Sequence, residues 1–195
     1  MNILYLGPYH EQMIQFLKSF GDTVVQTEEP ITLLTLEQNN IDFLISYRYR
    51  SILKKEILDR FVYKAINLHT SYLPWNRGAD PNIWSFLHNT LKGVTIHYLD
   101  SGIDTGDIIA QKTVEYMPSD TLKTSYNRLI AEIEALFLEI WPDVRCGNIV
   151  AVSQPIAGGT YHKKVDKEPY LHLLNNGWDT PVERIIGMAD TKNLY

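Results

Sequence analysis

Residues 65–69 read Ala65-Ile66-Asn67-Leu68-His69, an apolar run that carries two polar side chains. Comparable apolar runs stand earlier in the chain at residues 3–6, 23–25 and 43–46, and the segments between them are typical of short helices. Strands that alternate with helices at this pace indicate α/β units on a parallel sheet. We therefore expect an α/β fold with a mostly parallel sheet, in which residues 65–69 contain the fourth strand.

The sequence changes character after this fourth strand. Residues 70–82 hold prolines, a glycine and aromatic side chains, which is typical of a structured loop. Two more strands are predicted at 94–98 and 108–114, with a turn rich in glycine and aspartate between them. A long amphipathic helix follows, and we expect it to end at Pro142.

Length and composition fit one globular domain with a small appendage. The 195 residues are 45% hydrophobic and 21% charged, and the formal charge is −5. We place the domain at residues 1–157 and a short C-terminal extension at 158–195, where the chain becomes more polar. Because the acidic balance includes no basic block, a nucleic-acid partner is disfavoured. The single cysteine, Cys146, excludes an intrachain disulfide and a cysteine zinc site, and we expect no metal.

The N-terminus and the apolar runs bear on the cellular location. The first residues lack the basic region of a signal peptide, and no apolar run approaches the ~20 residues of a membrane span. We therefore expect a cytoplasmic protein without membrane contact. The polar C-terminal extension still carries apolar side chains such as Leu171, Leu174 and Trp178, which must fold back or meet a partner, and we expect a homodimer.

Three polar side chains are candidates for chemistry. Alternation along the fourth strand sends Asn67 and His69 to the same side, near the end of the strand where open α/β sheets bind their ligands. Asp104 lies in the turn Ser101-Gly102-Ile103-Asp104-Thr105-Gly106, where it is either an ordinary turn residue or a third functional group. An asparagine, a histidine and an aspartate together can polarise a carbonyl, move a proton and orient the imidazole.

Four runs of sequence follow one another in a fixed order. They are Ile66 to Pro74, Arg77 to Pro81, Gly93 to His97 and Ser101 to Ile109. In order and spacing they resemble the formyltransferase family that uses 10-formyltetrahydrofolate. The resemblance implies a Rossmann-like formyltransferase fold, and it places the family's catalytic asparagine, histidine and aspartate at Asn67, His69 and Asp104. The resemblance implies that Asn67 and His69 stabilise an oxyanion and that Asp104 orients the imidazole, while either His69 or a water bound to Asp104 accepts the proton of the attacking amine.

The resemblance also implies where the formyl donor, 10-formyltetrahydrofolate, would bind. One loop and one turn would contact the pterin of the folate through their backbone. The residues expected to do so are Ser51, Ile52, Leu53, Leu99, Asp100 and Asp104. For Ile52 and Leu53, packing in the core is an equal alternative.

Family members differ in the amine that receives the formyl group. A glycine-rich phosphate loop after the first strand would indicate the purine-pathway member, but this chain has Gly7-Pro8-Tyr9-His10 there, and Pro8 has no N–H to offer a phosphate. The acidic charge disfavours the tRNA-directed member. The runs at 72–84 and 158–164 resemble the sugar N-formyltransferases, which act on nucleotide-linked amino-dideoxysugars for surface polysaccharides such as lipopolysaccharide.

The resemblance to sugar N-formyltransferases implies an acceptor that binds beside the catalytic residues. We expect a dTDP-linked aminosugar, although the sequence does not identify the sugar or the position of its amine. Trp75, Arg77 and Asp80 share the loop after the fourth strand and are candidates for contact with it. Lys163 and Lys164 are candidates for the pyrophosphate, while adjacent lysines are also common on solvated surfaces.

Two other functions would use the same residues. A hydrolase that releases formate from formyltetrahydrofolate needs the same three side chains, with water as the nucleophile. A catalytically silent module that binds a nucleotide or folate is the second alternative, and the intact set of Asn67, His69 and Asp104 argues against it. Release of tetrahydrofolate that depends on an acceptor separates the transferase from both.

Overall fold

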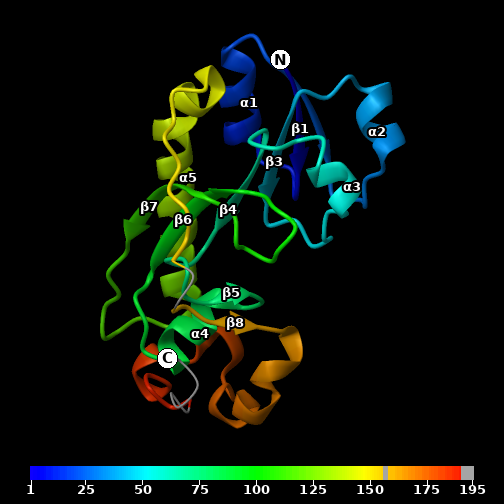
Figure 1. The fold of residues 1–195 in the computed structure, drawn as a ribbon. Coiled ribbons are helices and arrows are strands. Elements are labelled where there is room, and N and C mark those ends of the chain that lie inside the picture. Colours follow the sequence, from blue (N-terminus) through cyan, green and yellow to red (C-terminus); the bar gives the residue numbers. More distant parts are fainter. Residues whose placement is uncertain (156–157, 190–195) are drawn as a thin grey trace.

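A six-stranded sheet with the strand order β2-β1-β3-β4-β6-β7 organises the chain in a computed structural model that describes residues 1–155 and 158–189 (Figure 1). The strands are β1 (Asn2–Leu6), β2 (Thr23–Thr27), β3 (Phe43–Tyr47), β4 (Ala65–His69), β6 (Gly93–Tyr98) and β7 (Ile108–Thr113). The first four strands are parallel, whereas β6 pairs antiparallel with both β4 and β7. The prediction of an α/β fold with a mostly parallel sheet is therefore confirmed.

Helices cover both faces of the sheet because the central strands are apolar on both sides. Helices α1 (Glu11–Ser19) and α5 (Leu122–Cys146) pack on one face, and α2 (Leu33–Gln38) and α3 (Lys55–Leu58) lie against the other. Along β1, Ile3 and Tyr5 belong to the core on one face and Leu4 and Leu6 to the core on the other, and all four side chains are fully buried. Burial of one such side chain stabilises the fold by roughly 1.5–3 kcal/mol. In the described ranges, no helix combines the length and the apolar character that crossing a membrane requires.

Helix α5 is longer than the sequence predicts. It follows the N-cap residue Thr121, continues through Pro142 to Cys146 and ends at Gly147, whose φ of 72° is left-handed. The predicted end at Pro142 is therefore wrong. Trp141 and Val144 are buried on either side of the proline, and their packing against the sheet offsets the ~3 kcal/mol that an interior proline costs.

A second group of elements lies beyond the carboxyl end of β4. It contains α4 (Pro81–Leu87), the two-residue strands β5 (Arg77–Gly78) and β8 (Tyr161–His162), and the 3-10 helices η1 (Lys164–Leu173), η2 (Gly177–Asp179) and η3 (Val182–Arg184). Figure 1 shows these elements together at the lower end of the molecule. Strands β5 and β8 pair in parallel, so the C-terminal segment lies against the loop that follows β4.

An apolar cluster fixes the C-terminal segment to the rest of the chain. Its buried members are Ile83, Trp84, Phe86, Leu87, Leu122, Val182, Ile185 and Ala189. Residues 158–189 therefore share a core with α4 and with the start of α5. The predicted division into 1–157 and 158–195 stays a prediction, and its boundary falls on residues 156–157, which lie outside the described part of the chain, as do 190–195.

Candidate active site

The structure brings Asn67, His69 and Asp104 together at the carboxyl end of β4. Asn67 Nδ2 donates to Asp104 Oδ1 at 3.3 Å, and His69 Nδ1 lies 3.6 Å from Asp104 Oδ2. Asp104 reaches this point from the turn between β6 and β7, where its backbone is left-handed with a φ of 53°. Gly106 allows this turn because a Cβ there would lie 1.9 Å from the Tyr98 carbonyl oxygen.

Asp104 carries a negative charge in this arrangement. Its side chain is 12% exposed, and the Gly78 N–H donates to Oδ2 at 2.8 Å. Burial by itself raises the pKa of Asp104, but His69, His97 and the Gly78 N–H favour the carboxylate and hold its pKa far below the usual range. The site thus presents a fixed negative charge to two imidazole rings.

His69 is available as a neutral base. It is buried, and this burial lowers the pKa of its imidazole; His97 acts in the same direction, while Asp104 opposes both. Its Nε2 lies 3.3 Å from the backbone carbonyl oxygen of Asn76. Both ring nitrogens of His69 therefore face acceptor oxygens, an arrangement that stabilises the imidazolium once a proton has been accepted.

Sequence reasoning misses the role of His97. The β4–β6 register places His97 opposite Asn67, and its Nδ1 lies 2.8 Å from the Tyr98 carbonyl oxygen. Its Nε2 lies 3.3 Å from Asn67 Nδ2 and 3.6 Å from Asp104 Oδ1, so the ring contacts both the asparagine and the carboxylate. The available signal was its place on the strand beside the one that carries Asn67, directly before the Asp104 turn.

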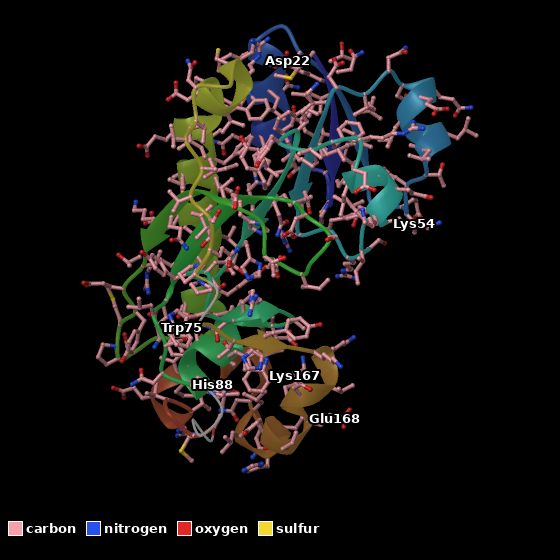
Figure 2. The ribbon with its side chains drawn as sticks, viewed as in Figure 1. Asp22, Lys54, Trp75, His88, Lys167 and Glu168 are labelled. Carbon is pink, nitrogen blue, oxygen red and sulfur yellow. The ribbon has the colours of Figure 1, made fainter. Side chains whose placement is uncertain are left out.

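The predicted acceptor contacts lie in the loop after β4. Trp75 is half-buried, and Arg77 and Gly78 form β5. The carboxylate of Asp80 is 2.6 Å from Lys167 Nζ, so η1 supplies a cation that the sequence pattern did not single out. Figure 2 shows Trp75 and Lys167 in the same lower part of the molecule.

The predicted pyrophosphate lysines are next to this loop. Lys163 and Lys164 are both exposed, at the junction of β8 and η1. The Lys163 backbone N–H donates to Asp166 Oδ2 at 2.7 Å, which closes the first turn of η1. The loop and the two lysines therefore adjoin the same β5–β8 pair.

The predicted folate-contacting segments meet at one apolar cluster. Leu53 and Leu99 both pack against the core formed by β1, β3 and α2. Ile52 is 80% exposed, so the core alternative is wrong for this residue and correct for Leu53. Ser51 is half-buried, and the carboxylate of Asp100 accepts from Gly102 N–H at 3.1 Å and from the Thr105 hydroxyl at 2.7 Å.

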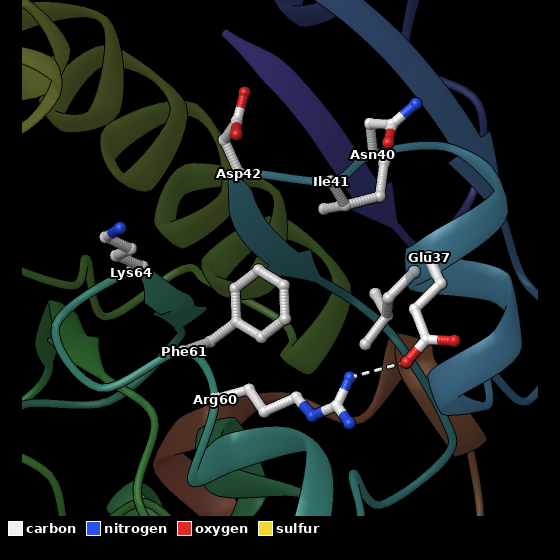
Figure 3. A pocket seen from close by; sticks show the side chains of 8 residues that line it. Glu37, Asn40, Ile41, Asp42, Arg60, Phe61 and Lys64 are labelled. Carbon is white, nitrogen blue, oxygen red and sulfur yellow. Dashed lines mark hydrogen bonds and ion pairs between the residues drawn. The ribbon is translucent and has the colours of Figure 1, made fainter.

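A separate surface cavity of about 530 Å³ lies at the other end of the sheet (Figure 3). It is lined by residues that precede β3 and β4, including Asp42 and Lys64. An ion pair of 2.8 Å between Arg60 and Glu37 crosses it. None of the three predicted catalytic residues lines this cavity, so it is separate from the cluster at the end of β4.

Histidine and carboxylate side chains also form metal sites in proteins, where several of them converge on one point. Within residues 1–155 and 158–189, no group of three or more histidine, cysteine, aspartate or glutamate side chains is arranged to hold a metal ion. The contacts among His69, His97 and Asp104 are those of hydrogen-bonding and charged groups.

The chain matches known proteins over most of its length. Residues 20–140 match the family model described as formyl transferase. The chain is 34% identical over 166 residues to the methionyl-tRNA formyltransferase of Agathobacter rectalis, and this match covers 83% of this chain and 52% of that protein. It is 30% identical over 172 residues to the cytosolic 10-formyltetrahydrofolate dehydrogenase of Xenopus laevis, covering 85% of this chain and 18% of that protein. The chain thus spans about half the length of the first relative and less of the second.

A solved structure is similar over nearly the whole chain. The formyltransferase PseJ from Anoxybacillus kamchatkensis is 54% identical, with a TM-score of 0.94, and the match covers 97% of this chain and 100% of that one. PseJ was crystallised in complex with UDP-4,6-dideoxy-4-formamido-L-AltNAc and tetrahydrofolate.

Proposed function

The chain belongs to the formyl transferase family, and on this premise we propose that it transfers the formyl group of 10-formyltetrahydrofolate to the amine of a nucleotide-linked amino-dideoxysugar. The observation that carries the proposal is the meeting of Asn67, His69 and Asp104 in one buried, charged cluster. The similarity to PseJ over 97% of the chain supports the same class of donor and acceptor.

The reaction needs groups that stabilise charge and move one proton. The acceptor amine attacks the formyl carbon, a C–N bond forms, and the carbonyl oxygen becomes an oxyanion. Asn67 Nδ2 stabilises this oxyanion by donating a hydrogen bond, and protonated His69 stabilises it through its positive charge. His69 takes the proton that the amine loses. When the tetrahedral intermediate collapses, the bond from carbon to the folate nitrogen breaks, protonated His69 returns its proton to that nitrogen, and tetrahydrofolate leaves with His69 again neutral.

Asp104 supports this proton transfer through charge. Burial favours neutral His69 before the reaction, so the base is free at neutral pH. The Asp104 carboxylate then stabilises the imidazolium that forms, as carboxylates do for histidines in other acyl transfers. His97 and the Gly78 N–H keep Asp104 charged and in place.

We place the folate donor at the two segments that meet beside β3, residues 51–53 and 99–100. Exposed Ile52 offers an apolar side chain that the flat pterin can cover, and Leu53 and Leu99 give this surface a firm base. Backbone groups of Ser51 and Asp100 are the remaining proposed contacts of the folate.

The proposed acceptor carries uridine diphosphate. PseJ, at 54% identity, holds a UDP-linked 4-formamido sugar, so we favour UDP over the dTDP expected from the sequence. The sugar would lie beside Trp75, Arg77 and Asp80. Exposed Lys163 and Lys164 would attract the pyrophosphate against the acidic background of the chain.

Three further parts of the proposal concern the setting of the enzyme. The product would serve the synthesis of a surface polysaccharide such as lipopolysaccharide, in the cytoplasm and without nucleic-acid or membrane partners. Homodimer formation is supported by exposed apolar side chains of the C-terminal segment, among them Val165, Leu171 and Trp178. Light scattering that gives a mass near 22.5 kDa at micromolar concentration would reject the dimer.

The decisive experiment measures tetrahydrofolate release from 10-formyltetrahydrofolate. We expect release to require a UDP-linked 4-amino-4,6-dideoxysugar, with the dTDP-linked sugar and tRNA as comparison acceptors. Release of formate without an acceptor would establish the hydrolase alternative. No release with any acceptor would leave a binding module.

A further inference from the structure

We infer that Thr160, in the C-terminal segment, is a positioning residue that fixes the protonation pattern of His69 by holding the backbone carbonyl of Asn76. The inference rests on the proposed function only in assigning catalysis to His69. The contacts that carry it are those between Thr160, Asn76 and the His69 ring. Figure 1 shows where the two segments meet, at the β5–β8 pair below β4.

Asn76 is held in a conformation that needs support. It is completely buried, and its φ of 58° is left-handed, a region that asparagine tolerates better than most residues. Its side-chain Nδ2 donates to Thr90 Oγ1 at 2.8 Å. Its backbone N–H donates to Thr160 Oγ1 at 2.8 Å, and the same hydroxyl donates to Asn76 Oδ1 at 3.2 Å. One threonine hydroxyl thus satisfies two polar groups of Asn76 at once.

Thr160 is itself fixed on both sides of Asn76. Its backbone N–H donates to the Pro74 carbonyl at 3.2 Å, and its carbonyl accepts from the Arg77 N–H at 2.9 Å. Gly159 makes this approach feasible, since a Cβ there would lie 2.2 Å from the Pro74 carbonyl oxygen. The hydroxyl of Thr160 therefore has little freedom to turn away from Asn76.

The Asn76 carbonyl selects which nitrogen of His69 carries the hydrogen. It lies 3.3 Å from Nε2, within hydrogen-bond distance, whereas Asp104 Oδ2 lies 3.6 Å from Nδ1, which is beyond it. The resting neutral ring therefore keeps its hydrogen on Nε2. Nδ1 is then the nitrogen that accepts a proton, and it does so beside the Asp104 charge that stabilises the product.

Loss of the Thr160 hydroxyl should change which nitrogen of His69 carries the hydrogen while the catalytic cluster stays folded. In Thr160→Val the shape is kept, but the N–H and Oδ1 of Asn76 lose their partner, so the Asn76 carbonyl loses its fixed direction. We expect kcat to fall on the order of tenfold, with KM for both substrates changed less than about twofold. Thr160→Ser keeps the hydroxyl and should restore most of kcat.

A second threonine of the same segment provides the matched control. Thr180 is as deeply buried, and within the described ranges its Oγ1 has no hydrogen-bond partner. Thr180→Val should leave kcat unchanged. Equal losses in Thr160→Val and Thr180→Val would attribute the effect to general packing and overturn the inference.

The direct readout is the imidazole nitrogen spectrum of His69, measured by ¹⁵N NMR without substrates. The wild-type protein should show hydrogen on Nε2, and Thr160→Val should show a mixture with the Nδ1–H form. An unchanged spectrum together with unchanged kcat would overturn the inference. If Thr160→Val does not fold, Asn76→Gly tests the same point, because glycine accepts the left-handed backbone while removing both side-chain contacts.

The outcome also separates this inference from the proposed function. Because the nitrogen spectrum needs no reaction, a shift in Thr160→Val would support the positioning role even if wild-type protein transferred no formyl group. That combination would reject the proposed function alone. A normal wild-type reaction with no spectral or kinetic change in Thr160→Val would reject the positioning role alone.

Discussion

Strand β4 and strand β8 contribute to the same site in different ways. β4 is flanked by β3 and β6 in the middle of the sheet, and its side chains Asn67 and His69 reach the site directly. β8 is two residues long and pairs with β5 in a two-stranded sheet, so it acts on the site through the loop that contains β5. The placement of the β4 side chains needs only correct strand pairing in a continuous core. The support that β8 gives depends on contacts between segments far apart in the chain.

This difference separates the residues expected to perform the chemistry from those expected to hold them. The sheet side carries His69 and Asn67, the proposed base and the proposed oxyanion donor. The C-terminal side holds Asn76 and Gly78, whose backbone carbonyl and N–H face His69 and Asp104. Substitution of the sheet-side residues should therefore abolish most of the activity, and substitution of the residues on the C-terminal side should reduce the activity by smaller factors.

The largest effect is expected from His69→Asn. The amide cannot accept the proton that the attacking amine loses, so turnover should fall roughly a hundredfold or more, the range of general acid–base catalysis. Tetrahydrofolate release under saturating substrates measures it. His172→Asn is the control, because His172 is exposed on η1 and should keep full activity. Near-normal turnover in His69→Asn would reject the assignment of the base.

Gly78→Ala tests the support that β8 gives to the site. A Cβ at Gly78 would lie 2.4 Å from the His162 carbonyl oxygen, so β5 must move, and with it the N–H that donates to Asp104. We expect kcat to fall about tenfold to a hundredfold, because small displacements of reacting groups are costly.

Gly21→Ala isolates the role of that contact. Gly21 has a φ of 79°, close to the 86° of Gly78, but nothing lies within 4 Å of its Cβ position. Both variants bear similar backbone strain, and only Gly78→Ala breaks the β5–β8 approach. If the two variants lost the same activity, backbone strain and not β8 would explain the result.

The sheet could be predicted from the sequence because its signals are local. Apolar runs indicated the strands, and alternation along the fourth strand put Asn67 and His69 on one side. Asp104 could be placed with them only through the resemblance of its turn to a family motif. The predicted end of α5 at Pro142 was wrong because the sequence shows the proline but not the burial of Trp141 and Val144 around it.

The support of the site could not be predicted in the same way. No local pattern places Thr160 against Asn76 or Lys167 against Asp80, since each pair joins segments distant in sequence. Asn76, whose backbone is left-handed, forms hydrogen bonds with one of these distant partners, Thr160. Such contacts arise from the packing of the C-terminal segment on α4, which becomes visible only in three dimensions.

Acid should loosen the C-terminal segment before β1 and α1. His162 stacks on Trp84 with ring centroids 3.8 Å apart, and burial, with His88 adding to it and Asp166 opposing it, lowers the pKa of His162 to about 4. The folded pKa is below the unfolded value of about 6.5, so the folded state binds fewer protons between these values. The stability that this site contributes is complete above a pH of about 6.5 and is lost as the pH falls towards about 4.

On the sheet side, the stability contributed by Asp22, which is labelled in Figure 2, is not lost in this pH range. Burial raises the pKa of this carboxyl, but Arg145 and the N-terminal amine hold it below its usual value, so its contribution persists until more acidic pH. Hydrogen exchange at about pH 7 and about pH 4.5 should therefore show faster opening in residues 158–189 than in β1 and α1.

His162→Phe is the variant that tests the acid prediction. Phenylalanine keeps a ring on Trp84 but does not titrate, so the fall of Tm between about pH 6.5 and 4.5 should be smaller by roughly 3–6 °C than in the wild type. Some pH dependence should remain, because burial also lowers the pKa of His88. Identical Tm curves for the two proteins would contradict a role for His162.

The smallest effect concerns two ion pairs of equal length, one on each side of the comparison. Lys167 Nζ and Asp80 are 2.6 Å apart and join η1 to the loop before α4, whereas Lys55, the first residue of α3, is 2.6 Å from Asp59, the residue that follows this helix. The Lys167 pair is the less exposed, at 24% and 29% against 72% and 58%. Water and salt therefore screen it less, and it restrains a longer stretch of chain.

Double-mutant cycles with Lys→Met and Asp→Asn should give a coupling of about 0.5–1 kcal/mol for Lys167 with Asp80 and about 0.3–0.5 kcal/mol for Lys55 with Asp59. Urea unfolding at low and high salt measures both, and added salt should weaken the α3 pair proportionally more. If Asp80 also contacts the acceptor, Lys167→Met frees its carboxylate and should change KM for the nucleotide sugar, while Lys55→Met leaves KM unchanged. Equal couplings and an unchanged KM would mean that the C-terminal segment supports the site through its backbone pairing and its apolar core, with no electrostatic part.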